Sequence, residues 1–335
     1  MSSLDHPTNS PKGNGPVIGQ LSLRDIFLPI LVLMVLGPLV GVVIQLSGIT
    51  RKYYGEELVQ AEAKPPESQE KKLSQARLRL WNSGIGLPLL ALAFPLFFMA
   101  KTGVSAKEMG WKTTGLVKAL ATAVLVSLAL IPPVYGIQWL MIQWHSTLSS
   151  SLTVEHPLTF FAGQSLTGVE WGLLFLTATV GAPFLEEQVF RGVLQPWFSA
   201  KPRGGSCALA AAAFICLVQS ADLWRLWGEE LFRGQFHWRL EYWKAVLPLG
   251  FLLVPAFVIF LLEKNGKRAM AGLIGTAALF GMIHGFAWPS PIGLTVLGIG
   301  LGLIFQRTGN IFAPICVHGI FNGFALAALA FQPVK

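Results

Sequence analysis

Charged residues are scarce in this sequence. Only 13% of its 335 residues are Asp, Glu, Lys or Arg, while 53% are hydrophobic. A soluble domain usually carries about 25% charged residues. The shortfall argues against an ordinary soluble globular protein and indicates a membrane protein.

Cysteine is scarce as well. The three cysteines, Cys207, Cys216 and Cys316, all lie in apolar segments and show no metal-ligand spacing. The sequence therefore supports neither a disulfide framework nor a cysteine-ligated zinc site. We interpret all three as core residues.

The formal net charge of +8 comes from basic residues that lie mostly between the apolar runs. This placement is typical of orientation in a membrane rather than of nucleic-acid binding, so no nucleic-acid partner is expected. The connections Lys101–Lys112, Lys201–Arg203 and Lys264–Arg268 are basic and are predicted to lie inside. The connection from His145 to Glu170 has no Lys or Arg and is predicted to lie outside. If the spans alternate in direction, the loop from Arg51 to Arg79 also lies outside, although it is basic. This conflict with the positive-inside rule leaves the N-terminal topology open.

Long apolar runs dominate the rest of the chain. A spanning helix needs roughly 20 consecutive apolar residues, and the first run, 26–49, is too long for the core of a signal peptide. Further spans are predicted at 83–100, 116–143, 169–198, 205–220, 245–263, 268–287, 291–306 and 310–331. We therefore predict an all-α, polytopic transmembrane bundle of about eight or nine spanning helices, the number depending on the short segment 205–220.

Two segments are expected to lie outside the bundle. Residues 1–20 are rich in Ser, Pro, Gly and Asn and are predicted to be a disordered cytoplasmic tail. The stretch 221–244 combines Trp and Phe with Arg and Glu, which predicts an amphipathic helix in the membrane interface. Residues 21–165 are then the N-terminal transmembrane helices and loops.

Few polar side chains fall within the predicted spans. An ionisable residue in a spanning helix costs about 2.5–3.5 kcal/mol and by default marks a functional site. The candidates lie in three segments: Glu186, Glu187 and Arg191, then His284, then His318 and Asn322. Each alone is explained equally well by a structural hydrogen bond or ion pair, but their joint occurrence favours function.

The two adjacent glutamates are expected to act differently. Glu187 and Arg191 are four residues apart in the orientation that favours an ion pair on a helix. Glu186 points about 100° away from Glu187 on the helix and is left to face elsewhere. A carboxylate in a cavity of low dielectric suits a general base that acts on water.

The remaining candidates are two histidines and an asparagine. His284 can exchange one proton near neutral pH. His318 and Asn322 share a helix face and are predicted to aim hydrogen-bond donors at one point, as an oxyanion site requires. Glycines four residues apart flank both groups, which predicts close packing of three polar helices around one cavity.

Three motifs follow one another along the chain. They are "EEQVFR", which reads EExxxR, then "FGMIH" (Phe280 to His284), which reads FxxxH, and "HGIFN" (His318 to Asn322), which reads HxxxN. Together with their flanks, over roughly residues 170–325, they resemble the CPBP family of intramembrane proteases, the CAAX-protease and bacteriocin-processing group also called Abi proteins. Residues 166–331 are thus expected to be a CPBP-like protease core with an insert at about 204–265.

The resemblance implies an endopeptidase that hydrolyses peptide bonds within or beside the bilayer. Glu186 would activate the attacking water, with His284 helping to position or polarise it. His318 and Asn322 would stabilise the oxyanion, and Glu187 and Arg191 would support the first motif. The substrate would be a membrane-associated protein or peptide, plain or lipid-modified, and the enzyme a multi-pass protein of a bacterial plasma membrane.

Whether a metal takes part is left open. Glu186, His284 and His318 can in principle ligate zinc and leave one position for water, but no HExxH helix makes such a site specific. The cofactor is therefore either zinc or none.

Two other functions and one topological question stay open at this point. A proton-coupled transporter would also need ionisable residues in its spans, and a non-catalytic membrane scaffold would keep the same fold.

The insert separates the first motif from His284. If both of its apolar segments cross the membrane, the helix that leads to His284 keeps the direction it has in relatives, and if only one crosses, that direction reverses.

Overall fold

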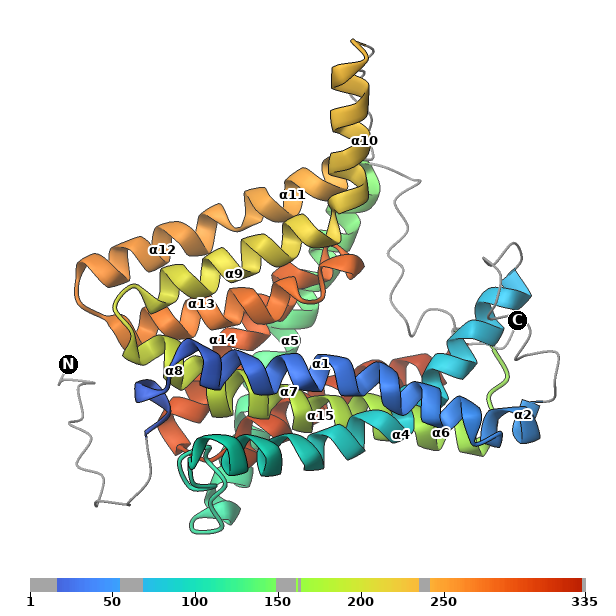
Figure 1. Cartoon of the computed structure of the whole chain (residues 1–335), viewed down its shortest axis with the longest axis horizontal. Coiled ribbons are helices and arrows are strands. Elements are labelled where there is room, and N and C mark those ends of the chain that lie inside the picture. Colours follow the sequence, from blue (N-terminus) through green and yellow to red (C-terminus); the bar gives the residue numbers. More distant parts are fainter. Residues whose placement is uncertain (1–16, 55–68, 149–160, 162–163, 235–241, 333–335) are drawn as a thin grey trace.

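The computed structural model describes residues 17–54, 69–148, 161, 164–234 and 242–332 (Figure 1). Within these residues the secondary structure is entirely helical, which confirms the predicted all-α class. Of the predicted tail, residues 1–16 lie outside the described part, and η1 (Ile18–Gln20) forms a 3₁₀ turn with Ile18 buried.

The N-terminal half consists of α1 (Leu23–Leu46), α2 (Ile49–Tyr54), α4 (Gln69–Thr102) and α5 (Leu116–Leu148). One long helical run follows, made of α6 (Gly168–Leu174), η4 (Phe175–Gly181), α7 (Ala182–Glu187), η5 (Gln188–Leu194) and α8 (Gln195–Ala200). The remaining helices are α9 (Gly204–Gln219), α10 (Ala221–Phe232), α11 (Trp243–Phe251), α12 (Leu253–Lys264), α13 (Arg268–Met282), α14 (Ser290–Thr308) and α15 (Phe312–Ala330).

Local sequence explains where several helices begin and end. Ser22 caps α1 and exchanges hydrogen bonds with Asp25, and Thr167 does the same with Glu170 at the start of α6. Such capping boxes satisfy the free amide groups of a helix start. Gly309, with φ of 57°, ends α14 in the left-handed conformation that glycine adopts without strain.

Seven helical runs in the described residues are long and apolar enough to span a bilayer. They are Leu23–Leu46, Leu73–Thr102, Leu116–Thr147, Gly168–Ala200, Ala245–Lys264, Ser290–Thr308 and Phe312–Ala330. The bent pair α9 and α10 makes an eighth if it counts as one span. The predicted polytopic bundle is confirmed, with seven or eight candidate spans where about eight or nine were expected.

The predicted span 268–287 is wrong in extent. Helix α13 has only 15 residues and ends at Met282. A turn that includes η7 (Gly285–Ala287) connects it to α14. The apolar stretch continues beyond Met282, so hydropathy alone gives no sign of this helix end.

The insert forms two antiparallel passes beside α13. Helix α9 runs along α13, and the chain returns through α11 and α12 before it enters α13 (Figure 1). The small residues Ala208 and Ala212 of α9 are fully buried, which lets the two helices lie close together. Because the chain passes along the bundle twice before α13, this helix runs in the same direction as α9, and the reversal that a single pass would cause does not occur.

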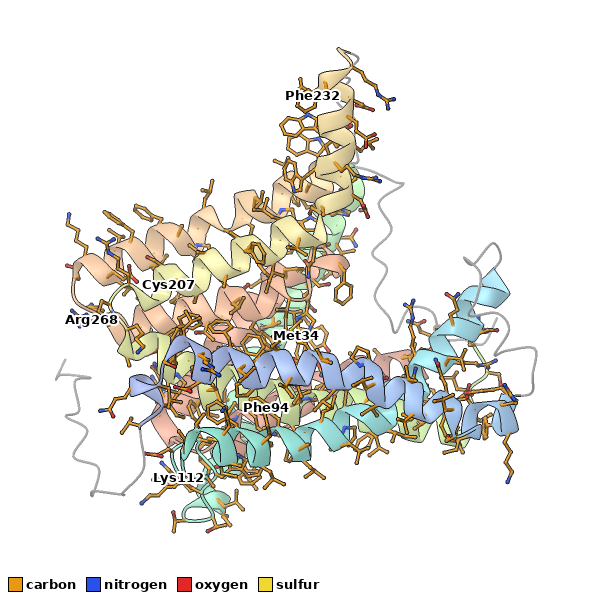
Figure 2. The ribbon with its side chains drawn as sticks, viewed as in Figure 1. Met34, Phe94, Lys112, Cys207, Phe232 and Arg268 are labelled. Carbon is orange, nitrogen blue, oxygen red and sulfur yellow. The ribbon has the colours of Figure 1, made fainter. Side chains whose placement is uncertain are left out.

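Basic connections gather at one end of the bundle. Lys112, between α4 and α5, and Arg268, at the start of α13, both lie at this end (Figure 2). The connection from α8 to α9 lies there too, while α2 and the start of α6 lie at the opposite end (Figure 1). This arrangement agrees with the predicted inside and outside connections.

Helix α10 projects from the bundle. It is bent by 66° from α9, and none of its residues is fully buried. Its charged residues Asp222, Arg225 and Glu229 are exposed. The crosswise direction and the mixed composition fit the predicted interfacial helix for residues 221–232, while residues 235–241 of that prediction lie outside the described part.

A polar cluster fastens α6 to the N-terminal half. Glu170 is fully buried, and its Oε1 lies 2.8 Å from Arg77 Nε and accepts a hydrogen bond of 2.9 Å from the Tyr54 hydroxyl. Trp81 Nε1 donates to the same hydroxyl at 3.1 Å. Burial raises the pKa of Tyr54 well above its usual range. The cluster therefore holds the helical run that carries the first motif against α2 and α4.

Candidate active site

The two glutamates of the first motif end helix α7, between two π-helical segments. The π segments η4 and η5 precede and follow α7 in one continuous helical run. Every residue of η5 is buried. A π-helical turn adds a residue to the helix and rotates the side chains that follow, and such turns are frequent at functional sites.

Glu187 and Arg191 form the predicted ion pair. Arg191 Nη1 donates to Glu187 Oε1 at 3.0 Å, and the two side chains are 2% and 0% exposed. Arg191 Nη2 also donates to the carbonyl oxygen of Gly298 in α14 at 3.0 Å. The guanidinium carbon lies 4.6 Å from the centre of the Phe280 ring. The pair is thereby tied to both α13 and α14.

His318 lies between the two glutamates. Its Nδ1 is 2.8 Å from Glu187 Oε1, and its Nε2 is 4.0 Å from Glu186 Oε2. Glu186 thus stays outside the ion pair, as expected, and its carboxylate approaches the same histidine as Glu187. The Cβ directions of neighbouring residues do differ by about 100°, but a glutamate side chain is long enough to bend, and the two imidazole nitrogens face different directions.

Glu186 is the more open of the two acids. Its side chain is 23% exposed, against 0% for Glu187. Its Oε2 atom is nevertheless buried and has no hydrogen-bond partner among the described residues. Glu186 thus keeps an unpaired carboxylate oxygen next to His318.

His284 lies just after helix α13 rather than within it. Its Nδ1 is 3.0 Å from the carbonyl oxygen of Phe280. Because a carbonyl only accepts, we assign Nδ1 as the donor, which leaves the lone pair of the neutral ring on Nε2. His284 is partly buried.

Phe280 connects the second and third motifs. Its ring centre lies 5.4 Å from that of His284 and 5.6 Å from that of His318. No hydrogen bond or ion pair joins His284 to Glu186 or His318 in the described part of the chain, so the two histidines meet through this ring. Phe280 opens the FxxxH motif, but the spacing of that motif alone does not predict this contact with both histidines.

Asn322 does not aim its amide at the same point as His318. Its Nδ2 donates to the carbonyl oxygen of Ala178 in η4 at 2.7 Å. His318 instead bonds Glu187. Each side chain therefore has its own partner in this structure, although both lie on one face of α15, and the joint donor pair stays a prediction. One amide hydrogen of Asn322 is left for another acceptor.

The donor set proposed for zinc does not come together. Among the described residues, no three His, Cys, Asp or Glu side chains are grouped closely enough to hold a metal ion. Glu186 and His318 are neighbours, but His284 lies beyond Phe280 with its Nδ1 on a backbone carbonyl. A zinc ion held by Glu186, His284 and His318 does not fit this geometry.

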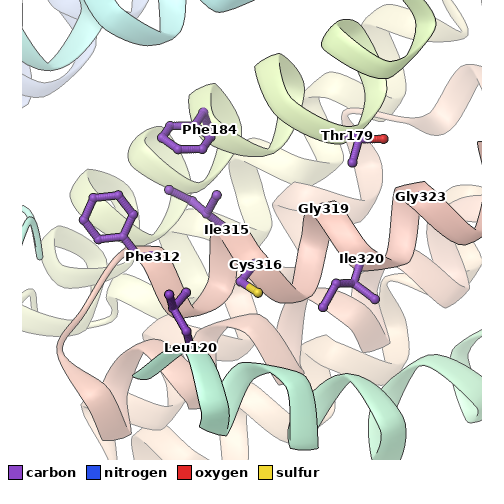
Figure 3. Close-up of a pocket in the computed structure, with 9 residues that line it drawn as sticks. All are labelled: Leu120, Thr179, Phe184, Phe312, Ile315, Cys316, Gly319, Ile320 and Gly323. Carbon is purple, nitrogen blue, oxygen red and sulfur yellow. The ribbon is translucent and has the colours of Figure 1, made fainter. Parts of the chain in front are cut away.

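An apolar groove of about 450 Å³ runs beside the third motif (Figure 3). Its walls come from α5, from η4 and α7, and from α15, with the lining residues Leu120, Thr179, Phe184, Phe312, Ile315, Cys316, Gly319, Ile320 and Gly323. Gly319 and Gly323 directly follow His318 and Asn322 in the chain. Neither the candidate catalytic residues nor α13 line this groove, so it is not the predicted cavity among three polar helices.

Residues 223–324 match the family model described as "Type II CAAX prenyl endopeptidase Rce1-like". No curated protein and no solved structure matches the chain. The matched segment is less than a third of the chain and contains His284, His318 and Asn322, while the first motif lies before it. The bond between Glu187 and His318 joins that first motif to the matched segment. Residues 223–324 are therefore similar to the CPBP/CAAX protease family, the family that the motifs resemble.

Proposed function

We propose that this protein is an intramembrane endopeptidase in which Glu186 activates water for attack on a peptide bond. The observation that carries the proposal is the buried, unpaired Oε2 of Glu186 at 4.0 Å from His318 Nε2. This distance is too long for a hydrogen bond, and a water molecule admitted between the two atoms would lie about 2.8 Å from each.

The proposed step moves one proton. Glu186 accepts a proton from the water, and the resulting hydroxide adds to the substrate's carbonyl carbon. The carbon–nitrogen bond then breaks, and Glu186 returns the proton to the leaving amine. The free amide hydrogen of Asn322 and a proton on His318 Nε2 would donate to the oxyanion from successive turns of α15, and His284 helps to orient the water by accepting a hydrogen bond at its own Nε2.

The surrounding residues hold this arrangement. Glu187 accepts from His318 Nδ1 and so fixes the ring with Nε2 towards Glu186. Arg191 offsets the charge of Glu187 in a fully buried position. Such an orienting acid behind a histidine is a recurring device of hydrolases.

The test is Glu186→Gln, which keeps the side-chain size but removes the base. We expect cleavage to fall by about 100-fold or more. Membrane proteomes of cells that carry the wild type or this variant are compared for a fragment that appears only with the wild type. Glu263→Gln is a matched control, because Glu263 lies in α12 and bonds Ser206 near the start of α9 rather than any residue of the three motifs. Undiminished cleavage by Glu186→Gln would refute the proposal.

We also propose that the substrate is lipid-modified. The groove beside α15 supports this, because its walls are apolar and its volume of about 450 Å³ lies within the usual range for ligand pockets. The matched family is described as a prenyl endopeptidase. A chain attached to the substrate would lie in the groove while the peptide bond lies at Glu186. The bacterial plasma membrane stays a prediction from the sequence.

Filling the groove tests the lipid-modified substrate. Cys316→Trp should lower kcat/KM for a prenylated peptide by about tenfold or more, because the indole occupies the place of the chain. Leu125→Trp adds the same side chain on α5 at a position that is 67% exposed and outside the groove, and should have little effect. Equal activity of both variants towards the prenylated peptide would contradict this part of the proposal.

A further inference from the structure

The insert reaches the turn that carries His284. Gln219 is the last residue of α9, and its Nε2 donates to the carbonyl oxygen of Ile283 at 3.1 Å. Ile283 immediately precedes His284. The last side chain of α9 is therefore bonded to the backbone of this turn.

The same glutamine contacts the residue on the other side of His284. A Cβ atom added at Gly285 would collide with Gln219 Oε1. The side-chain amide of Gln219 thus lies across the turn, with its nitrogen on Ile283 and its oxygen against Gly285. Only a residue without a side chain fits at Gly285 while Gln219 keeps this position.

The backbone at His284 needs such support. Its φ of −97° and ψ of 17° lie in the bridge region, which is sparsely populated and common at active sites. The carbonyl groups at the end of α13 lack partners within the helix. Phe280 O is satisfied by His284 Nδ1, and Ile283 O is satisfied by Gln219. The first bond orients the ring, and the second holds the backbone that carries it.

We propose that Gln219 is a positioning residue that fixes the His284 turn and thereby the direction of His284 Nε2. This inference rests on the proposed role of His284 in orienting water. It gives the insert a part in the reaction, because α9 supplies the residue that holds the turn. In the described part of the chain, the Gln219 side chain bonds this turn and none of the candidate catalytic side chains.

The main variant is Gln219→Met, which keeps the length of the side chain and removes the hydrogen bond. We expect kcat to fall about tenfold with KM nearly unchanged, because a misplaced catalytic group lowers the rate rather than the binding of substrate. Gln306→Met is the matched control. Gln306 is also an exposed glutamine that donates to a backbone carbonyl, that of Ala269 at 3.4 Å, and its variant should retain wild-type kcat.

A compensating pair tests the contact with Gly285. Gly285→Ala alone should lower kcat, because the new methyl group collides with Gln219. Adding Gln219→Ala removes the colliding atom, so the double variant should be more active than Gly285→Ala. A double variant less active than Gly285→Ala would speak against the proposed contact.

A second readout does not depend on cleavage. The full-length protein in detergent is treated with diethylpyrocarbonate, and modification of His284 is followed by mass spectrometry. We expect a change of about threefold or more in Gln219→Met and none in Gln306→Met, because a loosened turn alters the exposure of the ring. An unchanged modification rate together with unchanged kcat in Gln219→Met would overturn the inference.

The two proposals fail in different ways. Cleavage that survives Glu186→Gln refutes the proposed reaction, whatever the modification rate of His284 shows. Cleavage that depends on Glu186 but not on Gln219 refutes only the positioning role.

Discussion

At the scale of single residues, the site depends on charges buried together. Glu187, Arg191 and His318 are each at most 4% exposed, and each bonds another member of the group. Removing one partner of a buried pair leaves the other charge without compensation, which usually costs about 3–5 kcal/mol. The group therefore matters for stability as well as for catalysis.

Replacing Arg191 tests this directly. We expect Arg191→Met to lower the free energy of unfolding by about 3–5 kcal/mol, because Glu187 stays buried without its counter-charge. The measurement is reversible unfolding in mixed detergent micelles. Arg225→Met, at an exposed position on α10, should change it by less than about 0.5 kcal/mol. A loss as small for Arg191 as for Arg225 would show that the buried pair contributes little.

Phe280 tests how the two histidines are held. Its ring contacts Arg191, His284 and His318, so Phe280→Leu should reduce cleavage about tenfold or more by loosening all three. The free energy of unfolding should fall by only about 1–2 kcal/mol, because the side chain stays apolar and similar in size. Phe94→Leu, at a buried position of α4 that is 2% exposed, should lower stability similarly and leave cleavage nearly unchanged. Equal losses of cleavage in both variants would argue for a general packing effect.

At the scale of helices, close contact between η4 and α15 places the third motif. A Cβ atom at Gly319 would lie 2.9 Å from the carbonyl oxygen of Thr179, whereas one at Gly323 would lie 3.9 Å from Thr179 Cγ2. The two glycines are one turn apart on the same face of α15, but only the first is in tight contact. The hydrogen bond from Asn322 to Ala178 O depends on this approach.

The two glycines form a matched pair of variants. Gly319→Ala should push α15 from η4 and lower the free energy of unfolding by about 1–3 kcal/mol, as overpacking does. Gly323→Ala has room for the methyl group and should be neutral or slightly stabilising, because alanine favours a helix more than glycine does. Unfolding in detergent, with cleavage measured in parallel, checks both variants. The reverse order of stability would contradict the packing described for this interface.

At the scale of the whole molecule, the basic connections at one end of the bundle predict its orientation. Lys112 and Arg268 come from connections far apart in sequence and lie at the same end (Figure 2). The start of α6 lies at the opposite end (Figure 1). By the positive-inside rule, we predict that this end faces the cytoplasm.

Cysteine labelling of whole cells and of inverted vesicles checks this orientation. In a background without the three native cysteines, Lys112→Cys and Arg268→Cys should react with an impermeant maleimide only from the cytoplasmic side. Gln164→Cys, at an exposed position before α6, should react only from the opposite side. Labelling of Lys112→Cys and Arg268→Cys from different sides would rule out the two antiparallel passes of the insert.

Much of the architecture follows from the sequence by itself. Apolar runs of spanning length predict the helices because an unpaired backbone polar group is too costly in lipid. The spacing of Glu187 and Arg191 predicts their ion pair because a helix places residues four apart side by side. The three motifs resemble the protease family, and the match over residues 223–324 supports that resemblance.

Other features were decided only by the tertiary structure. The end of α13 before His284, the π-helical segments around α7 and the meeting of both glutamates at His318 leave no mark in hydropathy or spacing. Each depends on contacts between segments far apart in the chain, such as Gln219 with Ile283, Asn322 with Ala178 and Arg191 with Gly298. A helical pattern fixes which face a side chain leaves from, and the packed neighbours fix where that side chain ends.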